Sequence, residues 1–178
     1  MLFVLLLASP LCAGTITRPR CGTPERLRVF SMGALNEKQQ LMDVFRPELQ
    51  TSIVSSRGHF RIHFDTTGVN LPALVDAEGN RIEGTWRAFV DSAAKIFDAV
   101  WQREVSHFGF PAPASDHGAG GGDEYDVYIA EMIPGLYGLT QPEGALPDAQ
   151  SKAPSLLSSY IEVDNDFGRG YPTKGLAG

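Results

Sequence analysis

The stretch that decides the fold is RGHFRIHFD, residues 57–65, in which polar and hydrophobic side chains alternate. Period-two alternation of aromatic and β-branched residues is typical of a strand with one buried side. The sequence therefore predicts a strand with two different sides. The apolar side, facing a core, consists of Phe60, Ile62 and Phe64, and the other side, facing solvent, of His59, Arg61 and His63.

A helical repeat occupies residues 85–108. Its apolar residues recur at spacings of three and four: Trp86, Phe89, Val90, Ala93, Phe97, Val100, Trp101 and Phe108. The opposite side carries Asp91, Lys95, Asp98, Gln102 and Arg103. At 3.6 residues per turn, this pattern predicts an amphipathic helix of about six turns. Thr85 would cap the helix, and Gly109 and Pro111 would end it.

Two further strands are expected at residues 125–132, with Tyr125, Val127 and Ile129 on one face, and at residues 159–164. The predicted fold class is α+β, a small twisted sheet backed by one long amphipathic helix. Residues 36–47 would form a short helix in a segment preceding this sheet, capped by Asn36 and stopped by Pro47. Three strands and one helix leave one sheet face uncovered, which predicts a partner surface or further chain.

The amino-acid composition excludes some classes of function. Hydrophobic residues make up 43% and charged residues 20% of the chain, which is typical of a globular protein. The formal charge of −6 argues against a nucleic-acid partner, because phosphate binding needs a basic surface. Residues 1–13 hold an apolar run ended by Pro10, which favours a secretory signal over a buried strand. The run is too short to span a membrane, so we expect a secreted or extracytoplasmic protein without stable membrane association.

The motif PRCGTPE at residues 19–25 contains Cys21, the only thiol left once a signal carrying Cys12 is removed. A thiolate can ligate zinc at about 2.3 Å and fill the position of a reactive water. Arg20 would favour the thiolate, and Gly22 would let the backbone pass close to the metal. The motif resembles the cysteine-switch heptapeptide in the prosegments of matrix metalloproteinases. The alternative is a free thiol, or one whose partner lies outside this sequence.

A second resemblance covers about residues 57–171. The sequences GHFRIHFDTT (58–67), VDSA (90–93), GGGDEYDVY (120–128) and VDND (163–166) look like those of secreted bacterial metallopeptidases. In that group, a helix with the zinc-binding motif His-Glu-x-x-His soon follows VDND. The resemblance implies a signal peptide at 1–13, an inhibitory prosegment at 14–55 and the upper, sheet-bearing part of a zincin-type catalytic domain at 56–178. It also implies zinc as cofactor and a peptide or protein as substrate.

This chain contains no His-Glu-x-x-His sequence, so we expect it to be an N-terminal portion that is inactive alone. His59 and His63 would lie about 13 Å apart along a strand, too far to share an ion. Acidic residues could supply oxygen ligands for calcium, although ordinary turn formation and solvated charge are the favoured explanation: Asp123, Asp126, Asp164 and Asp166. The competing function is a complete, non-catalytic secreted binding module. A serine hydrolase is disfavoured, because Gly-x-Ser-x-Gly is absent.

Overall fold

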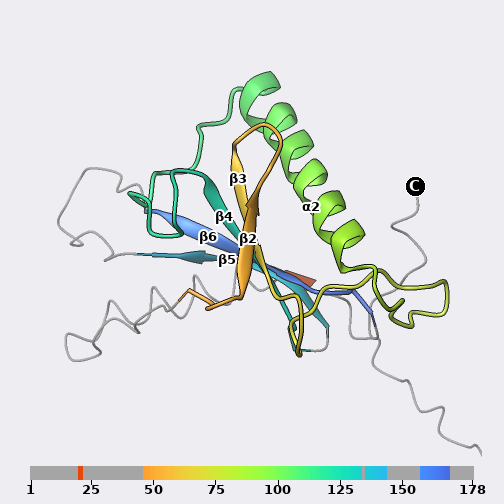
Figure 1. Ribbon diagram of the computed structural model, residues 1–178. Helices are drawn as coiled ribbons and strands as arrows, with labels where there is room; N and C mark the ends of the chain where they lie inside the picture. Colours follow the sequence, from red (N-terminus) through yellow and green to blue (C-terminus); the bar gives the residue numbers. More distant parts are fainter. Residues whose placement is uncertain (1–19, 22–45, 134, 144–156, 169–178) are drawn as a thin grey trace, which may run out of the picture.

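The computed structural model describes residues 20–21, 46–133, 135–143 and 157–168, and its centre is a mixed sheet with one long helix on one face (Figure 1). The six strands are β1 (Arg20–Cys21), β2 (Thr51–Val54), β3 (Phe60–Phe64), β4 (Tyr125–Ala130), β5 (Leu136–Pro142) and β6 (Ser159–Asp164). The helix α2 (Trp86–Trp101) continues as the π-helical segment η1 (Gln102–His107). The predicted α+β class is confirmed.

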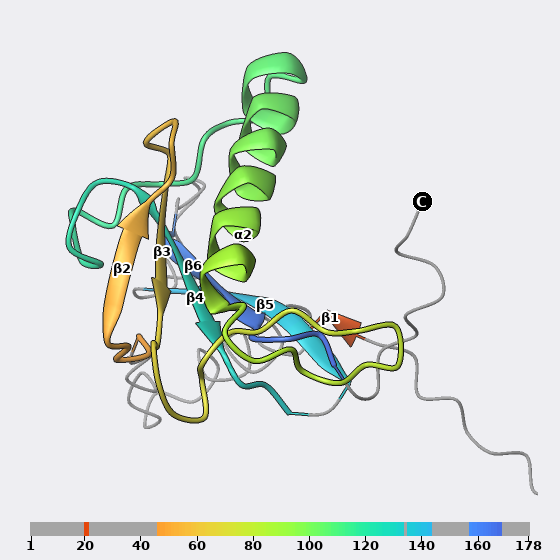
Figure 2. The ribbon, with the colours of Figure 1, turned by 45° about the vertical axis from the view of Figure 1, so that its right-hand side comes forward.

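The strand order is β1-β5-β6-β4-β3-β2, which Figure 2 shows from one side of the sheet to the other. The central strands β3, β4 and β6 are parallel. Strand β2 runs antiparallel to β3, β5 runs antiparallel to β6, and β1 is parallel to β5. The sequence predicted only β3, β4 and β6. Three additional strands therefore complete the sheet.

Strand β2 comes from the range 14–55 that the resemblance assigned to the prosegment. It pairs with β3 in one hairpin, with Thr51 opposite Phe64 and Val54 opposite Arg61. Residues 51–54 are thus part of the same sheet as the residues after 55. The predicted signal at 1–13, Gly22 and most of the predicted helix at 36–47 lie outside the described residues; Arg46 and Pro47 have no regular secondary structure.

The apolar side of β3 lies in the core, as the alternation predicted. Phe60, Ile62 and Phe64 are buried, and Ile62 has no exposed surface. They form one cluster with the β4 residues Val127 and Ile129 and the α2 residues Phe89, Val90 and Ala94. The strand and the helix therefore hold each other in place through one shared core.

The helix begins where the sequence predicted, but its apolar stripe is shorter. Val100 and Phe108 were expected to be buried, and their exposed fractions are 41% and 56%. Beyond Trp101 the hydrogen bonding changes: the Phe108 N–H donates to the Arg103 carbonyl, five residues earlier. That π-type spacing rotates later side chains away from the stripe. Within the described residues, no helix is long and apolar enough to cross a membrane.

Two polar residues of the helix behave differently from the prediction. The Thr85 side chain makes no cap bond to α2; its hydroxyl donates instead to the Ile82 carbonyl. Asp98 was placed on the solvent side, but it is buried, with an exposed fraction of 4%. The reason is a set of donors in the β2–β3 turn, which the sequence pattern could not reveal: the Ser55 and Ser56 hydroxyls and the Arg57 N–H.

We expect Asp98→Ala to lower the free energy of unfolding by about 1–3 kcal/mol, because the buried Ser55 hydroxyl loses its acceptor. Urea denaturation measures the change. Asp91→Ala, at an exposed position of the same helix, is the matched control and should change stability by less than about 0.5 kcal/mol. Equal effects of the two substitutions would show that the Asp98 contacts do not stabilise the turn.

Candidate functional site: a charged cluster and the outer edge of the sheet

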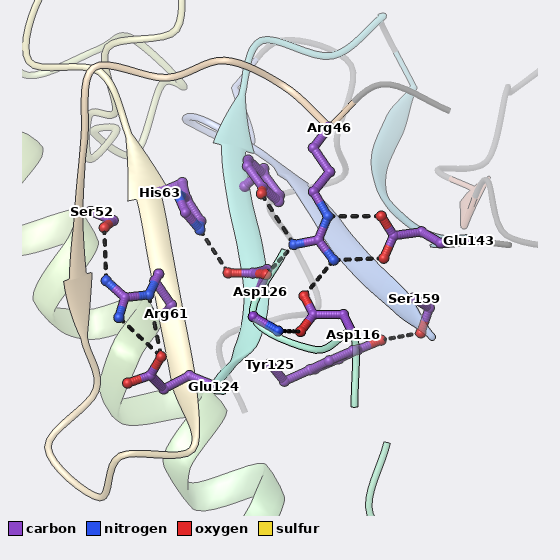
Figure 3. Close-up of polar contacts among 12 residues, drawn as sticks. Arg46, Ser52, Arg61, His63, Asp116, Glu124, Tyr125, Asp126, Glu143 and Ser159 are labelled. Carbon is purple, nitrogen blue, oxygen red and sulfur yellow. Dashed lines mark hydrogen bonds and ion pairs between the residues drawn. The ribbon is translucent and has the colours of Figure 1, made fainter. Parts of the chain in front are cut away.

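The sheet face opposite α2 carries aromatic and charged side chains (Figure 3). Because β3 and β4 alternate, their non-core sides place His63 beside Asp126 and Tyr128. The His63 Nε2 lies 2.7 Å from Asp126 Oδ1, and the His63 ring stacks on the Tyr128 ring with centroids 4.3 Å apart. The His63 side chain is only 13% exposed.

The prediction that both strand histidines face solvent is therefore wrong. His63 is covered by Asp126 and Tyr128, and His59 stacks on Trp101 of the helix with ring centroids 4.4 Å apart. Arg61 on the same strand contacts Glu124 at 3.0 Å. The non-core side of β3 is thus covered by side chains from β4 and from the residue just before it, whereas His59, which precedes β3, contacts the helix.

Arg46 lies at the centre of this face and pairs with carboxylates from three separate segments. Its Nη2 is 2.6 Å from Asp116 Oδ2 and 2.6 Å from Glu143 Oε2, its Nε donates to Glu143 Oε1 at 2.7 Å, and its Nη1 donates to Asp126. The Arg46 side chain is 14% exposed. Two parallel bonds to Glu143 form the bidentate pairing that suits a guanidinium.

This cluster, consisting of Arg46, His63, Asp116, Asp126 and Glu143, has more carboxylates than cations when His63 is neutral. Burial alone would raise the pKa of Asp126, but hydrogen bonds from His63 and Arg46 hold it below its ordinary value. Burial would likewise lower the pKa of Arg46, and its partners Glu143, Tyr128 and Asp126 raise it instead. The cluster therefore stays charged at neutral pH.

The cluster also fixes the ends of neighbouring strands. Glu143 directly follows β5, and Asp126 lies in β4, so the Arg46 guanidinium ties both strands to the chain that enters β2. Beside it, the Tyr125 hydroxyl lies 2.7 Å from the Ser159 hydroxyl at the start of β6, and burial raises the pKa of Tyr125. Polar side chains from β3, β4 and β6 and from the segments next to β2 and β5 thus meet at one centre.

The outer edge of the sheet lies on the far side of β5. There the backbone of Arg20–Cys21 runs parallel to β5, with Arg20 opposite Leu136 and Cys21 opposite Gly138. Gly138 pairs with Val163 of β6 on its other side. A Cβ added at Gly138 would approach the Glu162 carbonyl to 3.1 Å, so glycine permits close packing of this edge strand. The segment that contains Cys21 is therefore extended along an edge.

The four acidic residues considered for calcium lie in different surroundings. Asp123 is exposed, whereas Asp126 belongs to the charged cluster. Asp164 is buried and accepts the N–H groups of Met132, Asp166 and Phe167, and burial raises its pKa. Asp166 pairs with Arg81 at 2.5 Å. Among the described residues, no group of three or more His, Cys, Asp or Glu side chains could hold a metal ion. Calcium binding stays a prediction.

Fold and site together define an α+β domain with a helix on one sheet face, a charged cluster on the other and an extended segment along one edge. No protein-family model, no curated protein and no solved structure matches the chain. The sequence did not predict Arg46, Asp116 or Glu143 as site residues. The alternation in residues 125–130 was the only signal, since it set Asp126 and Tyr128 apart from the core side.

Proposed function

We propose that the chain is the N-terminal portion of a secreted zinc-dependent endopeptidase precursor, in which Cys21 maintains latency. The single observation that carries the proposal is the parallel pairing of Arg20–Cys21 with the outer edge of β5. A cysteine-switch-like motif would have to lie extended across a substrate-binding edge, and this pairing supports the proposal because it gives an extended backbone along one edge of the sheet.

An open strand edge binds extended peptides through main-chain hydrogen bonds. If substrate adds to β5, it needs the same carbonyl and N–H groups that face Arg20–Cys21. The segment and a substrate would then exclude each other. Removal of the segment by proteolysis would free both the edge and the position that the Cys21 thiolate occupies.

The charged cluster supports this role by fixing the edge strand. Arg46 holds Glu143 at the end of β5 and Asp126 in β4, so the backbone of β5 cannot shift without breaking partly buried ion pairs. A rigid edge strand loses little conformational entropy when a peptide adds to it. The cluster is therefore proposed as a positioning element of the precursor, in which it holds β5 for the Arg20–Cys21 segment, because Arg46 itself lies in the range 14–55 assigned to the prosegment.

The described residues do not themselves form a zinc site. In this proposal Cys21 is the only zinc ligand that the chain supplies, and the other ligands come from another part of the precursor. Thiolates are strong zinc ligands, and an adjacent arginine such as Arg20 favours the thiolate form. Arg20 and Gly22 are proposed to support Cys21 in this way.

The test uses the whole precursor, purified with its metal and then substituted with Co²⁺. A Cys21 thiolate on the metal should give a near-ultraviolet sulfur-to-cobalt charge-transfer band, because the ligand is a sulfur anion. We expect Cys21→Ser to abolish the band and to leave peptidase activity high without proteolytic activation. Thr23→Ser, two positions away in the same motif, is the matched control and should retain both the band and latency.

Several results would contradict the proposal. One is a precursor that binds no stoichiometric zinc, and another is an unchanged charge-transfer band in Cys21→Ser. A disulfide at Cys21 in the secreted precursor, detected by mass spectrometry without reduction, would also exclude it, since a disulfide sulfur cannot act as the thiolate ligand.

A further inference from the structure

We infer that a cleft beside the C-terminal half of the helix binds a doubly charged oxyanion of the phosphate type. The cleft has a volume of about 530 Å³ and lies between the β2–β3 turn and the helix. The turn contributes Ser56 and Arg57. The helix contributes Lys95, Gln102, Arg103 and His107. This site is separate from the charged cluster, which lies on the opposite face of the sheet.

The cleft carries an excess of positive charge. Arg57, Lys95 and Arg103 all line it, and none of them forms an ion pair with a carboxylate in the part of the chain that the structure describes. Asp98 is the one carboxylate in the lining, and its oxygens accept the Ser55 and Ser56 hydroxyls and the Arg57 N–H. An excess of two positive charges therefore gathers here, in a chain whose formal charge is −6.

Neighbouring side chains orient the two guanidinium groups of the cleft. Arg57 Nη1 donates to Gln102 Oε1 at 3.3 Å, and the Arg103 guanidinium carbon lies 4.9 Å from the centroid of the Phe108 ring. Neither contact neutralises the charge, and both restrict a long side chain. A guanidinium held in this way retains N–H groups that match two oxygens of a phosphate.

The π-helical segment η1 forms one wall of the cleft. Gln102, Arg103 and His107 all belong to it, and all three line the cleft. A π-helical turn is rare, since its hydrogen bonding is less favourable than that of an α-helix, and such turns occur frequently at functional sites. Here the wider turn forms the wall that carries Arg103, one of the three cationic side chains, together with Gln102 and His107. The ligand charge that best matches the excess is −2, which favours phosphate over a single carboxylate.

The experiment measures binding of inorganic phosphate to the chain by titration calorimetry, at a pH where phosphate is mainly the dianion. Sodium chloride at matched ionic strength is the reference. We expect saturable phosphate binding and a rise in Tm that chloride does not reproduce. In the double variant Lys95→Gln/Arg103→Gln, the affinity for phosphate should fall by at least about tenfold, because two charged donors are lost.

Arg87→Gln is the matched control, since Arg87 is an exposed cation of the same helix outside the cleft, and it should bind phosphate as the unsubstituted chain does. O-phosphoserine carries the same oxyanion on an organic group. Comparing its affinity with that of free phosphate therefore shows whether the cleft prefers the free ion or a phosphorylated organic ligand. All substituted positions are exposed, so the variants should retain their fold. The inference is overturned if phosphate stabilises no more than chloride, or if the double variant binds as tightly as the control. Neither outcome bears on the cysteine-switch proposal.

Discussion

Arg46→Met is expected to lower the free energy of unfolding by about 3–5 kcal/mol, the usual cost of removing one partner of a buried ion pair. Methionine has an unbranched side chain of similar length to the apolar part of arginine, so packing is largely kept. The substitution nevertheless leaves Asp116, Asp126 and Glu143 facing one another without their cation. Asp126 is the most affected, because its side chain is 1% exposed. Urea denaturation at neutral pH measures the loss.

Arg87→Met is the control for this prediction. Arg87 is exposed and lies over the Trp86 ring without an ion pair among the described residues, so its loss should cost less than about 1 kcal/mol. Equal destabilisation by Arg46→Met and Arg87→Met would show that the charged cluster does not contribute to stability.

The pH dependence of the Arg46→Met effect follows from Asp126. The pKa of Asp126 in the folded protein is below its ordinary value of 3.8, so its contribution is fully present above pH 3.8 and is lost as the pH falls through the folded pKa. We therefore expect the stability difference between the native chain and Arg46→Met to be constant near neutral pH. It should shrink upon acidification, first as the variant's carboxylates, which lack their cation, become protonated, and then below 3.8 as Asp126 of the native chain does. A difference that stays constant into that range would contradict the role given to Asp126.

Ile62→Ala is expected to lower the free energy of unfolding by about 2–5 kcal/mol, because Ile62 is fully buried between α2 and β4 and its truncation leaves a cavity. Ile96→Ala removes the same atoms from a helix position that is 61% exposed. That control should change stability by less than about 1 kcal/mol. Chemical denaturation of both variants decides the matter, and a similar loss at the two positions would contradict the proposed core.

The parts of the fold that the sequence predicted are those with a strong local period. The alternation around Ile62 and the three–four spacing around Phe89 and Val90 each mark one apolar face, and the two faces pack against each other in the core. Strand β5 was missed because Gly138 and Pro142 weaken its pattern, since neither residue favours a strand interior. Phe108 was misplaced because a change from α- to π-type hydrogen bonding is not visible in residue spacing.

The charged cluster could not be predicted for a different reason. Asp116 and Glu143 lie in segments without regular periodicity, Arg46 lies at the end of the segment predicted as a helix, and only the sheet order brings the three together. An isolated arginine or glutamate in such a segment is most often a solvated surface residue. Asp98 shows the same effect on the helix, because its three donors come from the turn before β3. Sequence patterns describe neighbours along one element, whereas these contacts join elements far apart in the chain.

The strand order has a consequence for how the polypeptide reaches its native state. The three central strands are parallel, and Phe60 must find Tyr125 while Val127 must find Ile161. Pairings between such distant segments require large loops to close before any contact compensates the lost entropy, and proteins dominated by them fold slowly. The β2–β3 hairpin can form as soon as it is synthesised, but its inner edge stays exposed until β4 arrives. During that interval the nascent chain is vulnerable to edge-to-edge aggregation.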